Sequence, residues 1–227
     1  MKNIIFIAPP AAGKGTLSKM LTDAYSLPHI STGDLLRETA NEESEMGKYI
    51  HEQMQSGGLV SDEIILDLLK TRISKEDCSN GYILDGFPRN VEQAKAYDDI
   101  LKELNKDLGY VFLLDIDKEI AKKRIVGRIS CPECGTVYNE FLVETKPKKD
   151  GLCDKCGIGL IRRSDDNEET FEKRFNTYFE KTEPLINYYQ QKGVLYTIPA
   201  NEGKDASFSE IKKVMFGEWC YDFYQNS

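Results

Sequence analysis

Two pairs of cysteines in the middle of the chain have a spacing typical of a metal site. Cys131 and Cys134 form one Cys-x-x-Cys pair, and Cys153 and Cys156 form a second pair after 18 intervening residues. Four thiolates so spaced can close around a tetrahedral Zn²⁺ and leave no coordination position open. We therefore predict a structural zinc that holds together a module too small to have its own core.

The loop Ala8–Thr16 carries the second chemical signal, a Gly-Lys pair between an apolar run and a helical pattern. Such a loop points backbone N–H groups and a helix N-terminus at an anion, and Lys14 can reach the outer phosphates of a nucleotide. The general pattern Gly-x4-Gly-Lys-[Ser/Thr] is broken twice, by Ala8 at its start and by Gly15 after the lysine. An ordinary turn containing a lysine is the alternative.

A third signal follows the apolar run Tyr82–Leu84, where the sequence reads Asp85-Gly-Phe-Pro-Arg89. An aspartate at the carboxyl end of a buried strand is placed to organise Mg²⁺ beside a phosphate-binding loop. Arg89 is expected at the same crevice, with Gln93 one helical turn further on. A Gly-Pro turn with a capping aspartate is the alternative.

Arginine is scarce in this chain and therefore informative. Lys and Arg together number 30, and the planar fork of Arg matches phosphate oxygens in a way that Lys does not. Arg124 and Arg128 are four residues apart, which would place both on one helix face. Phosphoryl transfer needs convergent cations, so we favour a phosphate-binding cluster over solvated surface charge; the arginines are residues 37, 72, 89, 124, 128, 162, 163 and 174.

The elements that must position these residues alternate between strand and helix. Short apolar runs predict strands at 4–7, 28–30, 82–84, 110–114 and 195–198. Helical periods and capping residues predict helices at 15–25, from 35 onward, and at 63–73, 91–104, 117–126, 168–189 and 208–215, with a turn or kink at Pro184. This order predicts an α/β fold with a five-stranded parallel sheet flanked by helices. Residues 128–161 lack periodicity and are predicted to be an inserted module.

Composition narrows the function classes. The 227 residues carry a net charge of −8, which disfavours nucleic acid as a partner. No apolar run reaches the roughly 20 residues needed to span a membrane, and no secretory signal is evident at the N-terminus. We expect a cytoplasmic protein. His29 and His51 have no spaced partners, and Cys78 and Cys220 are expected to be unpaired thiols.

Taken together, these motifs resemble the adenylate kinases of the long, lidded bacterial type, over nearly the whole chain. The resemblance rests on four ordered blocks: Gly13–Thr16, Ser31–Asp34 with Arg37, Asp85–Arg89 with Gln93, and Arg163-x-Asp165-Asp166 followed by Arg174. It implies a P-loop NTPase fold with core segments 1–30, 61–127 and 162–227. It also implies a small helical AMP-binding insertion at 31–60 and a zinc-binding lid at 128–161, here called the lid.

The resemblance also implies a reaction, ATP + AMP ⇌ 2 ADP, with ATP, AMP and ADP as partners, Mg²⁺ positioned by Asp85, and a monomeric protein. For ATP it implies contacts from Ala11, Ala12, Gly13, Lys14, Gly15, Thr16, Arg124, Arg128, Val137 and Tyr138. For AMP it implies Thr32, Arg37, Gly58, Leu59, Val60, Gly86, Phe87, Pro88, Arg89 and Gln93. Arg163 and Arg174 would bridge the two phosphate chains, and the catalytic set would be Lys14, Asp85, Arg89, Arg128, Arg163 and Arg174.

Two departures and two rival functions remain. The family usually has glycine where this chain has Ala8 and Ala11, which would cost strain if either backbone needs a positive φ. A UMP/CMP kinase of the same family is the first rival, disfavoured by Thr32 and Gln93. A zinc-ribbon protein that binds nucleic acid is the second, disfavoured by the acidic charge. The aromatic tail 216–224 has no functional explanation.

Overall fold

The chain divides into two compact units. The computed structural model describes residues 2–56, 60–163 and 166–217. The first unit comprises Met1–Ala8, Gly13–Leu114 and Lys181–Ser227, and the second comprises Pro9–Ala12 and Asp115–Glu180. The second unit therefore contains the predicted lid together with the segments that flank it on both sides.

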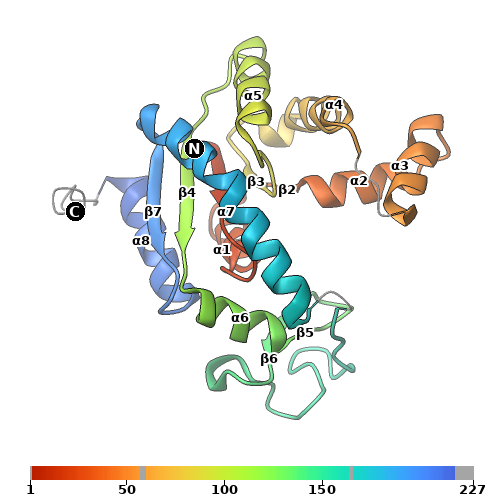
Figure 1. The fold of residues 1–227 in the computed structure, drawn as a ribbon, viewed down its shortest axis with the longest axis vertical. Helices are drawn as coiled ribbons and strands as arrows, with labels where there is room; N and C mark the ends of the chain where they lie inside the picture. Colours follow the sequence, from red (N-terminus) through yellow and green to blue (C-terminus); the bar gives the residue numbers. More distant parts are fainter. Residues whose placement is uncertain (1, 57–59, 164–165, 218–227) are drawn as a thin grey trace. The chain divides into compact units, whose positions relative to one another are not determined.

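A five-stranded parallel sheet forms the centre of the first unit, as predicted. Its strand order is β2-β3-β1-β4-β7; Figure 1 labels β2, β3, β4 and β7. The strands span β1 Ile4–Ile7, β2 His29–Ser31, β3 Ile83–Asp85, β4 Tyr110–Asp115 and β7 Leu195–Pro199. All four residues of β1 are buried, and β1 pairs in parallel with β3 and with β4. A strand covered on both faces explains the uninterrupted apolar run Ile4–Ile7.

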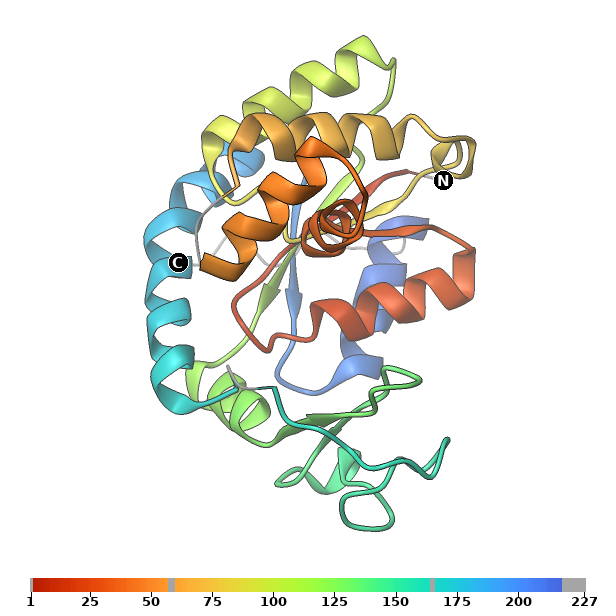
Figure 2. The same ribbon diagram turned by 90° about the vertical axis from the view of Figure 1, so that its right-hand side faces the viewer.

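Helices flank this sheet in pairs: α1 packs against α8, and α4 runs beside α5 (Figure 2). Side chains cap several of them: Ser31 accepts from Asp34 N–H at α2, Ser61 accepts from Ile64 N–H at α4, and Asn90 accepts from Gln93 N–H at α5. None of the described helices is both long and apolar enough to cross a membrane. The helices are α1 Lys14–Tyr25, α2 Thr32–Ala40, α3 Glu45–Ser56, α4 Asp62–Ile73, α5 Val91–Glu103 and α8 Lys204–Phe216, with the short 3-10 helix η1 at Glu76–Cys78.

The segment predicted as one helix from Leu35 is in fact two helices, α2 and α3. The hydroxyl of Ser44 accepts a hydrogen bond from Gly47 N–H at 2.9 Å, which is an N-cap arrangement. A Cβ at Gly47 would lie 2.4 Å from the carbonyl oxygen of Glu42, so the turn requires glycine there. This local capping ends the first helix and starts the second, and α2 also begins three residues earlier than predicted.

The second unit holds α6 Lys118–Val126, the antiparallel hairpin of β5 Arg128–Ser130 and β6 Val137–Asn139, and the 3-10 helix η2 Val143–Thr145. Helix α7 spans Glu168–Gln191 and starts in this unit. Of the turn or kink predicted at Pro184, a turn is ruled out, because α7 stays helical through the proline. Leu185 and Tyr189 beyond the proline are buried, and their burial outweighs the hydrogen bond that proline removes.

Candidate functional site

The loop after β1 has the backbone of an anion-binding turn. Gly13 has φ 98° and is the N-cap of α1, and Ala11 has φ 64°. Gly15 and Thr16 lie in the first helical turn. Left-handed residues close to a helix N-terminus turn successive N–H groups toward one side, which favours an anion there. The loop predicted from Gly13 and Lys14 therefore has the backbone conformation that phosphate binding needs.

Lys14 lies at the start of α1 and is half-buried. Its ammonium group donates a hydrogen bond to the carbonyl oxygen of Ala8 at 3.4 Å. Burial lowers the pKa of Lys14, the charge of Asp85 raises it, and the charge of Arg89 lowers it further. The structure therefore brings Lys14, Asp85 and Arg89 close enough for the charge of Asp85 to raise the pKa of Lys14 and for the charge of Arg89 to lower it.

Asp85 ends β3 and is held by a residue that sequence reasoning did not select. His29 Nε2 lies 3.4 Å from Asp85 Oδ2. Burial alone would raise the pKa of Asp85, but the hydrogen bond from His29 and the charges of Lys14, His29 and Arg89 together lower it. In the parallel register His29 is opposite Ile83, two residues from Asp85 and so on its face of the sheet. Only this register could have identified His29.

The turn Gly86–Arg89 is fixed through the carbonyl oxygen of Gly86. Thr32 Oγ1 donates to that oxygen at 3.3 Å, and Arg89 Nε donates to it at 2.8 Å. Gly86 has φ 80°, a conformation that favours glycine. The predicted acceptor-site residues Thr32, Gly86 and Arg89 are therefore in direct contact.

Gln93 is buried and uses both ends of its amide. Its Oε1 accepts from Arg89 N–H at 2.7 Å, and its Nε2 donates to Asp62 Oδ1 at 2.6 Å. Asp62 was not predicted, and no spacing in the sequence links it to Gln93. Arg37 lies apart from these bonds, on the surface, in an ion pair with Asp34. Val60 is half-buried, whereas Gly58 and Leu59 lie outside the described residues.

Arg124 and Arg128 do not share a helix face as predicted. Helix α6 ends at Val126, Gly127 is its C-cap, and Arg128 is the first residue of β5. Arg128 Nε donates to Asp166 Oδ2 at 2.7 Å, and Arg128 Nη2 donates to the other carboxylate oxygen. The Asp166 side chain is fully buried, so Arg128 is held in one orientation by a two-pronged ion pair.

The remaining predicted residues of the second unit vary in exposure. Arg163 precedes α7 and Arg174 lies on it, and both are exposed. Val137 is 48% exposed, whereas Tyr138 is buried at 7%. The hydroxyl of Tyr138 accepts from Asp154 N–H at 2.9 Å and lies 3.5 Å from Cys153 Sγ. Asp165 and the tail from residue 218 lie outside the described residues.

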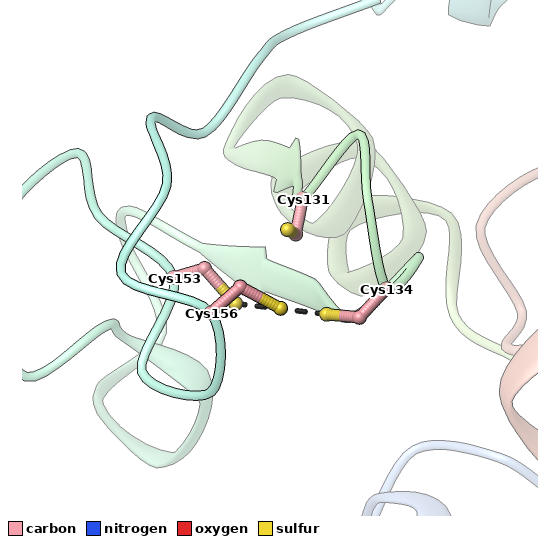
Figure 3. Close-up of side chains that lie close together, drawn as sticks. All are labelled: Cys131, Cys134, Cys153 and Cys156. Carbon is pink, nitrogen blue, oxygen red and sulfur yellow. Dashed lines mark hydrogen bonds between the residues drawn. The ribbon is translucent and has the colours of Figure 1, made fainter.

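The four lid cysteines point toward one another (Figure 3). Their Sγ atoms all lie within 4.8 Å of one another, and those of Cys134 and Cys153 are 3.6 Å apart. Zinc–sulfur bonds of about 2.3 Å in a tetrahedron require sulfur–sulfur distances of about 3.8 Å. The cluster therefore fits a Zn²⁺ ion. Cys78, predicted to be unpaired, is a free buried thiol in the first unit.

The two Cys-x-x-Cys turns have the same backbone hydrogen bonds. Cys131 N–H donates to Thr136 O at 3.0 Å, and Cys153 N–H donates to Ile158 O at 2.8 Å. Gly135 and Gly157, with φ 66° and 69°, follow the second cysteine of each pair and donate back to the first. Two matching turns that present thiolates from opposite sides are the arrangement that a closed site of four cysteines requires.

Ala11 offers a test of strain in the phosphate-binding loop. An alanine in the left-handed conformation destabilises the folded state by about 1–2 kcal/mol. A glycine in its place lowers stability by about 0.4–1 kcal/mol, because it raises the conformational entropy of the unfolded chain. We expect Ala11→Gly to leave the free energy of unfolding unchanged or to raise it by up to about 1 kcal/mol. Ala12→Gly is the matched control, because Ala12 lacks a positive φ, and should lower it by about 0.5–1 kcal/mol. Urea unfolding distinguishes the two, and equal losses would contradict strain at Ala11.

Known proteins resemble this chain over most of its length. A family model described as adenylate kinase matches residues 6–194. An adenylate kinase of Thermosipho africanus is 46% identical over 94% of this chain and 99% of its own length. Those of Archaeoglobus fulgidus and a Geobacillus species are 45% and 41% identical, over 94% and 95% of this chain and 97% and 99% of their own lengths. With its Gly13-Lys14 loop, its Asp85–Arg89 turn and its cysteine cluster, the chain belongs to the adenylate kinase family.

Proposed function

We propose that this protein transfers the terminal phosphoryl group of ATP to AMP, reversibly, to give two ADP. The observation that carries the proposal is the meeting of Lys14, Asp85 and Arg89 at the carboxyl ends of β1 and β3, in a chain of the adenylate kinase family. Ligands of open parallel sheets bind at these strand ends. The reaction needs no nucleophilic side chain, because aligned nucleotides and fixed positive charges lower its barrier.

On the ATP side, the backbone N–H groups of Ala11–Thr16 bind the phosphates and Lys14 neutralises the transferring group. Arg128 contacts phosphate, Arg124 lies against the adenine, and Val137 and Tyr138 contribute from the lid. The hydroxyl of Tyr138 already accepts a hydrogen bond from Asp154 N–H. We therefore assign the contact of Tyr138 with ATP to its backbone in β6. These assignments follow from the family and from the chemistry of each group.

On the AMP side, Gln93 reads the adenine edge, and Thr32 and the Gly86–Arg89 turn form the wall of the pocket. Arg37 leaves its exposed partner Asp34 to bind the AMP phosphate, an exchange that costs little because surface ion pairs contribute at most about 1 kcal/mol. Arg163 and Arg174 bridge the two phosphate chains. Of the segment 58–60 expected at this pocket, the structure describes Val60, which we propose contributes through its backbone.

Asp85 is the residue that would hold Mg²⁺. A hard cation of this kind prefers oxygen ligands, and the lowered pKa of Asp85 keeps its carboxylate ionised throughout the neutral range. Bound Mg²⁺ would neutralise charge on the phosphate oxygens. His29 holds the carboxylate in place from β2. The lid cysteines would hold the structural Zn²⁺, whose four positions are all filled by protein and which takes no part in the reaction.

Gln93→Leu tests the AMP side directly. Leucine has nearly the same size but offers no hydrogen bond, so the variant loses the polar contact with adenine and also the bonds to Arg89 N–H and Asp62. We expect the KM for AMP to rise at least about tenfold while the KM for ATP changes less than about twofold. Steady-state kinetics with each nucleotide varied in turn measures both. An unchanged KM for AMP would contradict the role of Gln93.

A further inference from the structure

Strand β6 connects the cysteine cluster to the end of helix α6. Successive side chains of a strand point to opposite faces. Tyr138 lies on the face of the cysteines, with its hydroxyl 3.5 Å from Cys153 Sγ. The next residue, Asn139, lies on the other face, where its side chain reaches α6, and it is 5% exposed. Two adjacent buried residues therefore join the metal-binding turns to this helix.

Every hydrogen-bonding position of the Asn139 side chain is used. Its Nδ2 donates to the carbonyl oxygens of Arg124 at 2.9 Å and of Lys123 at 3.5 Å. Its Oδ1 accepts from the N–H groups of Phe141 at 2.9 Å and Leu142 at 3.2 Å. Only one orientation of the amide fits these partners, because carbonyls need a donor and N–H groups need an acceptor.

The last carbonyls of a helix have no partner within the helix proper, and here residues beyond α6 supply partners. Asn139 bonds the carbonyl of Arg124 and, beside Gly127 N–H, that of Lys123. Arg162 donates to the carbonyl of Val126 while also pairing with Glu140. A Cβ at Gly127 would lie 2.2 Å from Asn139 Oδ1, so this close approach requires glycine at the C-cap. Side-chain hydrogen bonds therefore hold the β5–β6 hairpin against the end of α6, in addition to the chain that connects them.

The contacts between Asn139 and the end of α6 involve the two proposed ATP-binding arginines. Asn139 bonds the backbone of Arg124, and it is directly opposite Arg128 in the β5–β6 ladder. Asp166 then fixes the direction of the Arg128 guanidinium. Asn139 therefore acts on the backbone of the arginines, whereas Asp166 acts on the side chain of one of them.

We propose that Asn139 is a positioning residue for ATP binding: it holds the backbone of Arg124 and Arg128 so that both side chains meet the nucleotide. This inference rests on the proposed function, which assigns both arginines to ATP. In this proposal the β5–β6 hairpin connects the cysteine-bearing turns to the backbone of the two arginines. Without the amide, the end of α6 should be less ordered in the free protein. Binding of ATP would then have to order it, which lowers the affinity for ATP.

Two substitutions test the role of the amide. Asn139→Ala removes all four hydrogen bonds, and Asn139→Asp keeps the acceptor for Phe141 and Leu142 but places an oxygen against the carbonyls of α6. We expect each variant to raise the Kd for ATP at least about fivefold, while the Kd for AMP changes by less than about twofold. Each variant should still hold one zinc per chain. Val143→Ala, at an 87% exposed side chain, is the control and should leave both Kd values unchanged. Calorimetric titration with each nucleotide alone measures them.

The outcomes separate this inference from the proposed function. Arg128→Ala is titrated in parallel and should weaken ATP binding by itself. If it does and Asn139→Asp binds ATP as the natural protein does, Asn139 has no positioning role and the proposed function stands. If Arg128→Ala binds ATP normally, the assignment of the arginine is wrong and the inference fails with it. Equal weakening of ATP and AMP by Asn139→Asp would show a general structural role and would also overturn the proposal.

Discussion

Lys14→Met is expected to lower turnover by about a thousandfold or more. Removing a single charge-stabilising donor from an active site costs about 10²–10³, and in the proposed function this lysine neutralises the transferring group itself. In the folded protein its ammonium group is bonded to Ala8 and lies near Asp85 and Arg89. Methionine keeps the length of the side chain and removes the charge. A coupled assay of ADP formation measures the loss.

The same variant should remain as stable as the natural protein. Burial lowers the pKa of Lys14 from its ordinary value. At any pH below that ordinary pKa, holding the lysine in its ammonium form therefore lowers the stability of the folded state. Removing the charge removes this penalty at neutral pH. The unfolding midpoint should therefore fall by no more than about 2 °C. Lys19→Met, at an exposed lysine on α1, is the control and should keep full activity; more than about a tenth of natural turnover in Lys14→Met would contradict the assignment.

Removal of zinc is expected to unfold the lid while the first unit stays folded. The buried cluster of the lid consists of Ile129, Cys131, Tyr138 and Cys153, so cysteines supply much of its core. A structural zinc of this kind contributes about 10–16 kcal/mol of binding energy in small domains. Without it the cluster is too small to hold the backbone. Trypsin should then cleave after the exposed Lys148 or Lys149 at least about tenfold faster, since cleavage follows the open population.

Two measurements check this prediction. Metal analysis of protein purified without chelator should find one zinc per chain, and Cys153→Ala should lose it. Cys78→Ala, which lies outside the cluster, should retain it and serves as the control. Zinc-free purified protein, or a chelated protein whose lid is cleaved no faster, would show that the cysteines do not hold a structural metal.

The strands and the cysteine site could be predicted because their signals are local. Ile4–Ile7 and the strand that ends at Asp85 are short apolar runs bounded by turn residues, a pattern that favours a buried strand. Each Cys-x-x-Cys pair specifies its own turn, through a left-handed glycine that directly follows it. Parallel order then follows from the alternation of strands with helices.

The contacts that orient the site could not be predicted, because they depend on register and on side chains far apart in sequence. His29 reaches Asp85 only because β2 and β3 pair in one register. Asp62 and Gln93 are 31 residues apart, and Asp166 and Arg128 are 38 apart. Arg128 does not share a helix face with Arg124, because Asn139 bonds the Arg124 carbonyl that a longer helix would offer to Arg128 N–H. Hydrophobic periodicity describes one helix or strand at a time and gives no information on strand register or on contacts between distant residues.

The acceptor nucleotide tests the central claim most directly. Initial rates of ADP-coupled turnover with ATP and saturating AMP, UMP, CMP or GMP compare the four acceptors under identical conditions. Because Gln93 is held by Arg89 and Asp62 with its amide fixed in one orientation, it should favour adenine over bases with a different hydrogen-bonding edge. We predict that AMP is used at least about tenfold faster than the other three. A tenfold preference for UMP or CMP would contradict the proposed function.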